Sequence, residues 1–200
     1  MSNATYTIHC DGSCLGNPGP AAWGAVILHP DGIEAEHNGF IGHGTNQVAE
    51  LTAAIEALKH TPEGSEVHLI SDSEYLIKGL KVWLDGWVRK NWRTSTGKPV
   101  ANETLWHQFL ALRNARRVFP RWVRGHNGNP GNERADQLAR AAMDERGSTT
   151  RQGGKLPHAA RSTCDLAGCA RLAVAVDSNA NCGKTKESIA TVKAMIKKAP

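Results

Sequence analysis

Four acidic residues, far apart in the chain, could together bind divalent metal ions: Asp11, Glu50, Asp72 and Asp136. Hard cations such as Mg²⁺ prefer oxygen ligands, above all carboxylates. Two such ions about 4 Å apart can stabilise both the attacking and the leaving oxygen of a phosphoryl displacement. Without cations, four carboxylates in one place would repel one another and raise one another's pKa. Taken singly, each acid is better explained as a strand-end or helix-cap residue, so a metal site is indicated only if the chain brings the acids together.

The first and the fourth expected strands bring two of these acids to the same edge of a sheet. Asp11 follows a strand-like stretch from Tyr6 and precedes a cluster of Gly, Asn and Pro residues that is expected to end the strand. Asp72 follows the expected strand Glu66–Ser71. A helix between the two strands makes their pairing parallel, and sites in such sheets lie beyond the carboxyl ends of the strands. We therefore expect Asp11 and Asp72 to lie close together.

The other two acids lie on expected helices, at the border of the apolar face. Glu50 is near the start of a helix over Gln47–Lys59, for which Asn46 is a possible cap. Asp136 is in the second turn of a helix that begins at Asn132, where the helix dipole favours a negative charge. Both acids should lie between core and solvent.

The remaining segments complete a mixed α/β domain. The second and third strands form an antiparallel meander with the first, and Pro120 favours a sheet edge for the fifth strand. We expect a five-stranded sheet in the order 3-2-1-4-5 with helices on both faces. The segments not yet named are two strands, an aromatic-rich helical stretch, a helix and the fifth strand: Ala21–Pro30, Ile33–Ile41, Tyr75–Arg93, Asn102–Asn114 and Arg116–Arg124.

Short motifs surround the four acids. Each motif alone is a weak pattern, but their order and spacing on these elements are very specific. They are Cys10-Asp11-Gly12-Ser13 (continuing to Pro20), Ala49-Glu50-Leu51, Ser71-Asp72-Ser73 and the loop and helix start from Gly125 to Asp136. Over about residues 4–147, the chain resembles type 1 ribonuclease H.

The resemblance implies an endonuclease with the ribonuclease H-like fold, which hydrolyses the RNA strand of an RNA–DNA hybrid and leaves 5′-phosphate and 3′-hydroxyl ends. Asp11, Glu50, Asp72 and Asp136 then hold two Mg²⁺ ions when substrate is bound, with Asp11 between them, and Mn²⁺ can substitute. His126 matches a family histidine thought to assist proton transfer or product release, a task suited to a group that titrates near neutrality.

The resemblance also implies a set of substrate contacts. A reader of the 2′-hydroxyl is needed because this group distinguishes RNA from DNA. Residues that match the contacts to the RNA strand are Ser13, Gly16, Asn17, Asn46, Gln47 and Glu74. Thr45 matches a residue that binds a phosphate of the DNA strand. Two residues earlier, His43 stands where the family usually has a basic residue, so this phosphate pocket departs from the family pattern. The family's basic protrusion, which grips the duplex, is matched by Trp83, Trp87, Arg89 and Lys90.

The basic net charge of +5 belongs to the C-terminal part of the chain. Residues 151–200 contain nine Lys and Arg against three acidic residues, a net charge of +6, whereas residues 1–150 have a net charge of −1. We expect two parts: a ribonuclease H domain over residues 1–147, and a basic extension over 148–200 that begins with a linker at Ser148–Gly154 and is flexible or partly helical.

The cysteines of the extension leave one alternative open. His158, Cys164, Cys169 and Cys182 could form a zinc site, but their spacing matches no recognised zinc knuckle. A mostly disordered chain with a basic helix near Lys184–Lys198 is the favoured interpretation.

Composition limits the class of protein. No apolar run reaches membrane-spanning length and the start of the chain lacks the apolar core of a signal peptide, so we expect a cytoplasmic protein. We expect a monomer that needs no obligate protein partner. Two alternatives remain: a module of the same fold that binds hybrids or other nucleic acids without catalysis, and another nuclease or transposase of this fold.

Overall fold

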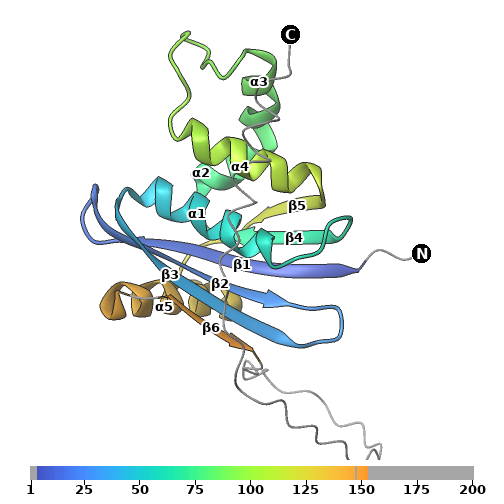
Figure 1. Ribbon diagram of the computed structural model, residues 1–200, viewed down its shortest axis with the longest axis vertical. Coiled ribbons are helices and arrows are strands. Elements are labelled where there is room, and N and C mark those ends of the chain that lie inside the picture. The colour runs from blue at the N-terminus through green and yellow to red at the C-terminus, as the bar shows by residue number, and fades with distance from the viewer. Residues whose placement is uncertain (1–3, 147, 153–200) are drawn as a thin grey trace, which may run out of the picture. The chain divides into compact units, whose positions relative to one another are not determined.

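The computed structural model describes residues 4–146 and 148–152, which form a mixed sheet with helices on both faces (Figure 1). The sheet order is β5-β4-β1-β2-β3-β6. The expected order of the first five strands, 3-2-1-4-5, is therefore confirmed. The strands are β1 (Thr5–Cys14), β2 (Gly19–Leu28), β3 (Glu34–Gly44), β4 (Glu66–Ser71), β5 (Arg117–Trp122) and β6 (Ser148–Gln152).

Strand β1 continues past Asp11, so the expectation that the strand ends there was wrong. Residues up to Cys14 remain paired with β2, and Asp11 lies opposite Gly24. The parallel pairing of β1 with β4 ends earlier, at His9 and Ile70. Asp11 and Asp72 each follow the last parallel pair by two residues, and they reach the same edge of the sheet as expected.

Helices cover the two faces unequally (Figure 1). The side chains of α1 and α4 bury the larger core against one face, and α5 packs on the other face. Thr45, and not Asn46, caps α1, because the Thr45 hydroxyl accepts a hydrogen bond from the backbone N–H of Val48 at 3.2 Å. These helices are α1 (Asn46–Lys59), α4 (Glu103–Asn114) and α5 (Pro130–Glu145).

The aromatic-rich stretch is helical, as expected, but only as far as Arg89, and it consists of three consecutive pieces. They are α2 (Glu74–Lys78), a π-helical turn η1 (Gly79–Trp83) and α3 (Leu84–Arg89). Aromatic contacts tie these pieces to α4. Trp106 is fully buried and donates its Nε1–H to the Tyr75 hydroxyl at 2.8 Å, and Trp87 packs edge-on against it at 5.4 Å. The tryptophans of this segment therefore serve packing as well as any surface function.

A sixth strand occupies part of the segment expected to be a linker. Ser148–Gln152 pairs antiparallel with β3, from Gly39 opposite Ser148 to Ala35 opposite Gln152. It covers the edge of β3, whose backbone groups would otherwise be open to pairing with another chain. The zinc-site alternative and the expected basic helix lie outside the described residues. Among the helices of the described part, none is long and apolar enough to cross a membrane.

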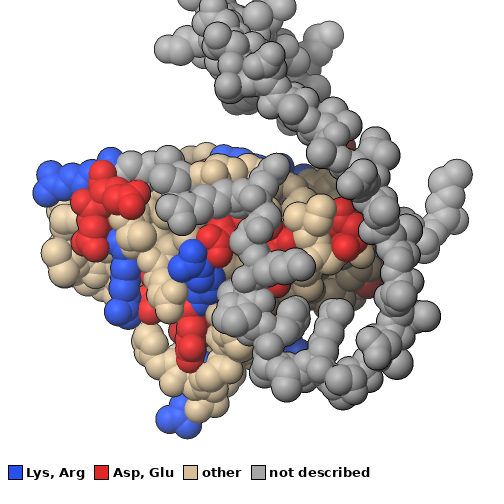
Figure 2. Space-filling model, turned by 90° about the horizontal axis from the view of Figure 1, so that it is seen from below, with Lys and Arg blue, Asp and Glu red and all other residues tan. Residues whose placement is uncertain are grey.

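Acidic and basic side chains lie close together on the face shown in Figure 2, without a broad patch of one sign. This mixture agrees with the near-zero net charge of residues 1–150. Attraction of the described domain to nucleic acid must therefore come from local groups and not from its overall charge.

A buried histidine pair predicts a loss of stability in mild acid. His37 is 4% exposed, its ring stacks on His60 at 3.8 Å, and its Nδ1 has no hydrogen-bond partner in the described structure. Burial, with His60 and His29 nearby, lowers the pKa of His37 to about 4 from an ordinary 6.5. The unfolded chain therefore takes up a proton below pH 6.5 that the folded chain does not bind until about pH 4, and stability falls across this window.

Urea unfolding at pH 7.5, 6 and 5 tests this effect. We expect His37→Phe to lose less stability than the original protein over this range, because the apolar ring removes the titration. An equal loss in both proteins would show that His37 does not contribute.

Candidate active site

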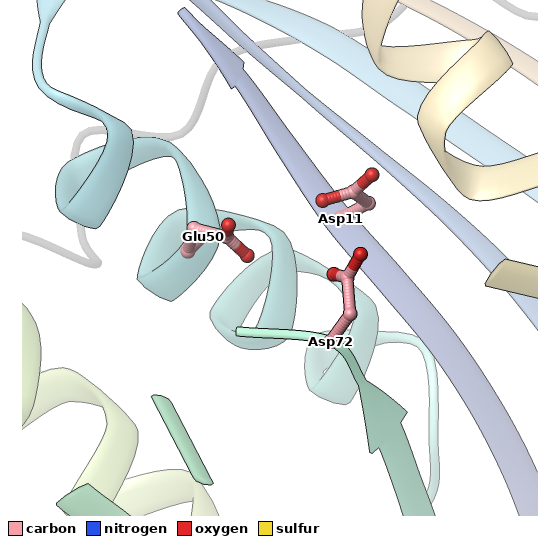
Figure 3. Close-up of side chains that lie close together, drawn as sticks. All are labelled: Asp11, Glu50 and Asp72. Carbon is pink, nitrogen blue, oxygen red and sulfur yellow. The ribbon is translucent and has the colours of Figure 1, made fainter. Parts of the chain in front are cut away.

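Three of the four acids converge at the carboxyl edge of the parallel strands (Figure 3). Asp11 comes from β1, Glu50 from α1 and Asp72 from the residue after β4. One carboxylate oxygen of each lies within 4.8 Å of the others. We call this group the carboxylate cluster. It brings together residues separated by up to about sixty positions in the sequence.

A close approach of α1 to β1 places Glu50 beside Asp11. A Cβ atom at Gly12 would lie 2.3 Å from the backbone nitrogen of Glu50 and 2.4 Å from the backbone of Ala49. Any residue other than glycine would push the helix away from the strand. Trp122 of β5 holds the backbone at Asp72, because the Trp122 Nε1–H donates a hydrogen bond to the Asp72 carbonyl at 2.9 Å.

Burial and the neighbouring carboxylates disfavour the ionised forms of Asp11 and Glu50 in the carboxylate cluster. Asp11 is 8% exposed, and burial, followed by the charges of Asp72 and Asp136, raises its pKa to about 7. Burial, followed by Asp11 and Asp72, raises the pKa of Glu50 well above its ordinary value. The Glu50 Oε2 atom is buried and lacks a hydrogen-bond partner among the residues described. A site with several carboxylate oxygens and no positive charge to balance them among the three acids fits divalent cations.

The fourth acid, Asp136, lies outside the three-residue cluster and pairs with Arg140. The Arg140 Nε donates to Asp136 Oδ1 at 2.8 Å, one helical turn along α5. Asp136 still lies near enough for its charge to raise the pKa of Asp11. The pairing of Asp136 with Arg140 was not predicted from the sequence, although an acid and a base four residues apart on a helix commonly pair.

His126 lies exposed in the loop before α5, with a left-handed backbone conformation of φ 50°. The structure does not bring it into the carboxylate cluster. Its expected assistance to catalysis therefore remains a prediction.

The predicted contacts to the RNA strand lie on two neighbouring segments and at the start of α2. Ser13 is at the end of β1, and Gly16 and Asn17 are exposed in the following turn. The Asn17 Oδ1 accepts a hydrogen bond from the backbone N–H of Asn46 at 3.3 Å, which joins this turn to the start of α1. Gln47 and Glu74 are exposed at the first turns of α1 and α2.

A surface hollow of about 390 Å³ contains most of the predicted duplex-gripping residues. Trp83, Trp87 and Lys90 line it, whereas Arg89 is exposed but does not line it. The hollow is also lined by Arg93, which the sequence places in the same basic segment, and by Thr94 and Ser95, which were not predicted from the sequence. Their polar groups add a cation and hydroxyls beside the aromatic rings, a combination suited to a nucleic acid backbone.

The repulsion within the carboxylate cluster predicts that removing one charge stabilises the metal-free protein. The folded state binds the Asp11 proton more tightly than the unfolded state, whose pKa is near 3.8, so the ionised group lowers stability as pH rises from 3.8 through about 7. Asp11→Asn should therefore raise the free energy of unfolding at pH 8 in EDTA and have little effect at pH 4.

Chemical denaturation at the two pH values measures this difference, and added Mg²⁺ should reduce it. The control is Asp85→Asn, which removes an exposed acid that pairs with Arg113 and should not stabilise the protein. Equal stability of Asp11→Asn and the original protein at pH 8 would contradict the account of the cluster.

Comparisons with known proteins agree with this site. The family model for RNase H matches residues 3–144. A protein named ribonuclease H from Geotalea uraniireducens is 48% identical over 137 residues, which cover 68% of this chain and 92% of the relative. Another from Chelativorans sp. is 50% identical over 136 residues, which cover 68% of this chain and 83% of the relative.

Solved structures give the same result. LC9-RNase H1, a type 1 RNase H, superposes with a TM-score of 0.69 and 27% identity, covering 77% of this chain and 80% of that one. LC11-RNase H1, solved in complex with an RNA/DNA hybrid, has a TM-score of 0.53 and 25% identity, covering 70% and 98% of the two chains. These matches confirm the resemblance noted in the sequence, and with the carboxylates converging at the expected sheet edge, the chain belongs to the type 1 ribonuclease H family.

Proposed function

We propose that this protein is an endoribonuclease that hydrolyses the RNA strand of RNA–DNA hybrids with the help of divalent cations. The observation that carries the proposal is the carboxylate cluster, in which three acids lie within 4.8 Å and one buried oxygen of Glu50 has no partner in the described part of the chain. Membership of the ribonuclease H family identifies the reaction, and one relative is known in complex with such a hybrid. The products are 5′-phosphate and 3′-hydroxyl ends.

Asp11, Glu50 and Asp72 hold the cations, and Asp136 completes the site from α5. Mg²⁺ is the proposed cofactor, with Mn²⁺ as a substitute, because both accept carboxylate oxygens. The cations, when bound, activate the attacking water and stabilise the leaving oxygen. Asp11 is the most buried of the three clustered acids and faces both other members, so it is the residue that would contribute to holding both cations.

His126 is proposed to assist proton transfer or product release. It is exposed and lies in the loop between β5 and α5. An imidazole at this place can take part in proton transfer without being part of the metal site.

Selectivity for the hybrid is proposed to come from contacts on either side of the cluster. Ser13, Gly16, Asn17, Asn46, Gln47 and Glu74 contact the RNA strand and its 2′-hydroxyls. The Thr45 hydroxyl accepts a bond from the Val48 N–H, and its own hydrogen remains able to donate to a phosphate of the DNA strand. Duplex grip comes from four residues of the aromatic segment: Trp83, Trp87, Arg89 and Lys90.

We infer that the protein acts as a monomer in the cytoplasm, with its catalytic domain in residues 1–147 and a basic extension in 148–200. A single chain supplies all four acids, so the reaction needs no second subunit. The non-catalytic alternative is less favoured, because a binding module would gain nothing from buried acids that repel one another. The alternative of another nuclease of this fold makes a different prediction about the substrate cleaved.

Cleavage of labelled substrates tests the proposed reaction. With Mg²⁺, we expect cleavage of an RNA–DNA hybrid and no cleavage of double-stranded RNA or double-stranded DNA. Asp11→Asn should lower turnover by at least about a thousandfold while hybrid binding persists, since it removes the group between the ions. Cleavage of DNA, or full activity of Asp11→Asn, would contradict the proposal.

A chain that ends at Gln152 tests the proposed division. It keeps β6 and removes a net charge of +5, which is the whole net charge of the chain. We expect unchanged turnover at saturating hybrid, weaker binding at moderate salt and a shallower dependence of binding on salt, because fewer counterions are released. An unfolded or inactive product would show that the extension belongs to the catalytic domain, and an unchanged salt dependence would show that it does not contact the hybrid.

A further inference from the structure

We propose that Glu36 and Asn38 of β3, together with Arg134 of α5, are positioning residues that hold α5 so that Asp136 faces the carboxylate cluster. The inference rests on the proposed function, because it takes Asp136 to be part of the cation site. It adds residues to which neither the sequence motifs nor the comparisons assign a part in the reaction.

The first attachment is a two-pronged ion pair. The Arg134 Nε donates to Glu36 Oε1 at 2.7 Å, and Arg134 Nη2 donates to Glu36 Oε2 at 2.9 Å. Glu36 is 7% exposed, so the pair is largely removed from water on the acidic side. Two parallel bonds between a guanidinium and a carboxylate fix direction as well as distance. The pair therefore limits rotation of α5 about its own axis.

The second attachment is a buried amide. The Asn38 Nδ2 donates to the backbone carbonyl of Leu138 at 3.0 Å, and Asn38 is 4% exposed. Glu36 and Asn38 are two residues apart on a strand and therefore point to the same face, with a rise of about 7 Å. Arg134 and Leu138 are four residues apart on a helix, a rise of about 6 Å. The two spacings match, and Asp136 lies midway between the two attachments.

A glycine lets α5 sit directly on the sheet at the level of Asp11. Gly24 of β2 pairs with Asp11 of β1. A Cβ atom at Gly24 would lie 2.2 Å from the backbone oxygen of Ala135 and 2.6 Å from the backbone nitrogen of Ala139. The helix backbone beside Asp136 therefore rests on the residue opposite Asp11, while the two β3 side chains hold the helix from the neighbouring strand.

This arrangement fixes the helix and leaves the Asp136 side chain free to change partner. The carboxylate now pairs with Arg140, which is on the same helix and largely exposed. In its proposed role the Asp136 carboxylate exchanges Arg140 for the cations, and this exchange succeeds only if the Cα of Asp136 is already at the correct place. A structural ion pair without this function would contribute to stability alone, and a kinetic test separates the two possibilities.

The main variant is Arg134→Lys, which keeps the charge but cannot bond both oxygens of Glu36 at once. Arg134 is changed rather than Glu36, because Glu36 makes additional interactions. We expect kcat with the hybrid to fall about tenfold and Mg²⁺ affinity, measured by calorimetry on the full chain, to fall by a similar factor. KM for the hybrid should change less than about twofold, because the predicted substrate contacts do not lie on α5.

The same change is then made in the Asp136→Asn protein. If Arg134 acts through Asp136, Arg134→Lys should lower neither kcat nor Mg²⁺ affinity further in that background, although it still lowers the melting temperature. The matched control is Arg116→Lys. The Arg116 guanidinium makes several hydrogen bonds to Thr61 and Leu112, away from α5, so this change should lower stability and leave kcat unaltered.

Normal kcat and Mg²⁺ affinity in folded Arg134→Lys would overturn the proposal. An equal loss with and without Asp136 would overturn it as well. Should Arg134→Lys fail to fold, Arg134→Gln, whose amide can still donate one hydrogen bond to Glu36, gives the same comparison. Absence of hybrid cleavage by the original protein would instead refute the proposed function, and the Mg²⁺ titrations would still test the positioning.

Discussion

Repulsion between partly buried carboxylates is the interaction on which the rest of this domain depends. Asp11, Glu50 and Asp72 are held within 4.8 Å of one another in a site where burial and neighbouring charge raise the pKa of Asp11 to about 7. Left to themselves these groups would separate or take up protons. The domain prevents separation by holding the backbone of each element rigidly, so the repulsion remains available for cations to relieve.

Each element that carries an acid is held in place by a different contact. The contact of α1 with β1 at Gly12 fixes Glu50, the Trp122 indole fixes the chain at Asp72, and α5 rests on β2 with bonds to β3. None of these contacts involves the reacting atoms. Around them lie the turn after β1 and the aromatic hollow of the η1 and α3 segment, to which we assign the proposed contacts with the hybrid. In this proposal, catalysis and substrate recognition belong to different parts of the domain.

The sequence was sufficient for features with a local signal or a simple topological rule. The parallel pairing of β1 and β4 predicted that Asp11 and Asp72 meet, and helical periodicity placed Glu50 at the edge of a buried face. Features that depend on contacts between distant segments could not be predicted. The polar strand β6 has no apolar alternation, and its pairing with β3 depends on an open edge that only the folded sheet provides. The choice between Thr45 and Asn46 as the cap of α1 depends on the backbone conformation before the helix, since both side chains can cap. The close approach of Gly12 to α1 cannot be predicted from the sequence around Gly12, because the helix begins more than thirty residues later in the chain.

We propose that the carboxylate cluster binds divalent cations next to the RNA strand of a hybrid. Anomalous scattering from Mn²⁺ in crystals of the protein with a hybrid would locate these cations. The Asp136→Asn variant would be used to slow cleavage. We expect manganese peaks within coordination distance of the carboxylates of Asp11, Glu50 and Asp72, with a phosphate of the RNA strand beside them. An absence of manganese at these three acids, with the hybrid bound, would contradict the proposed site.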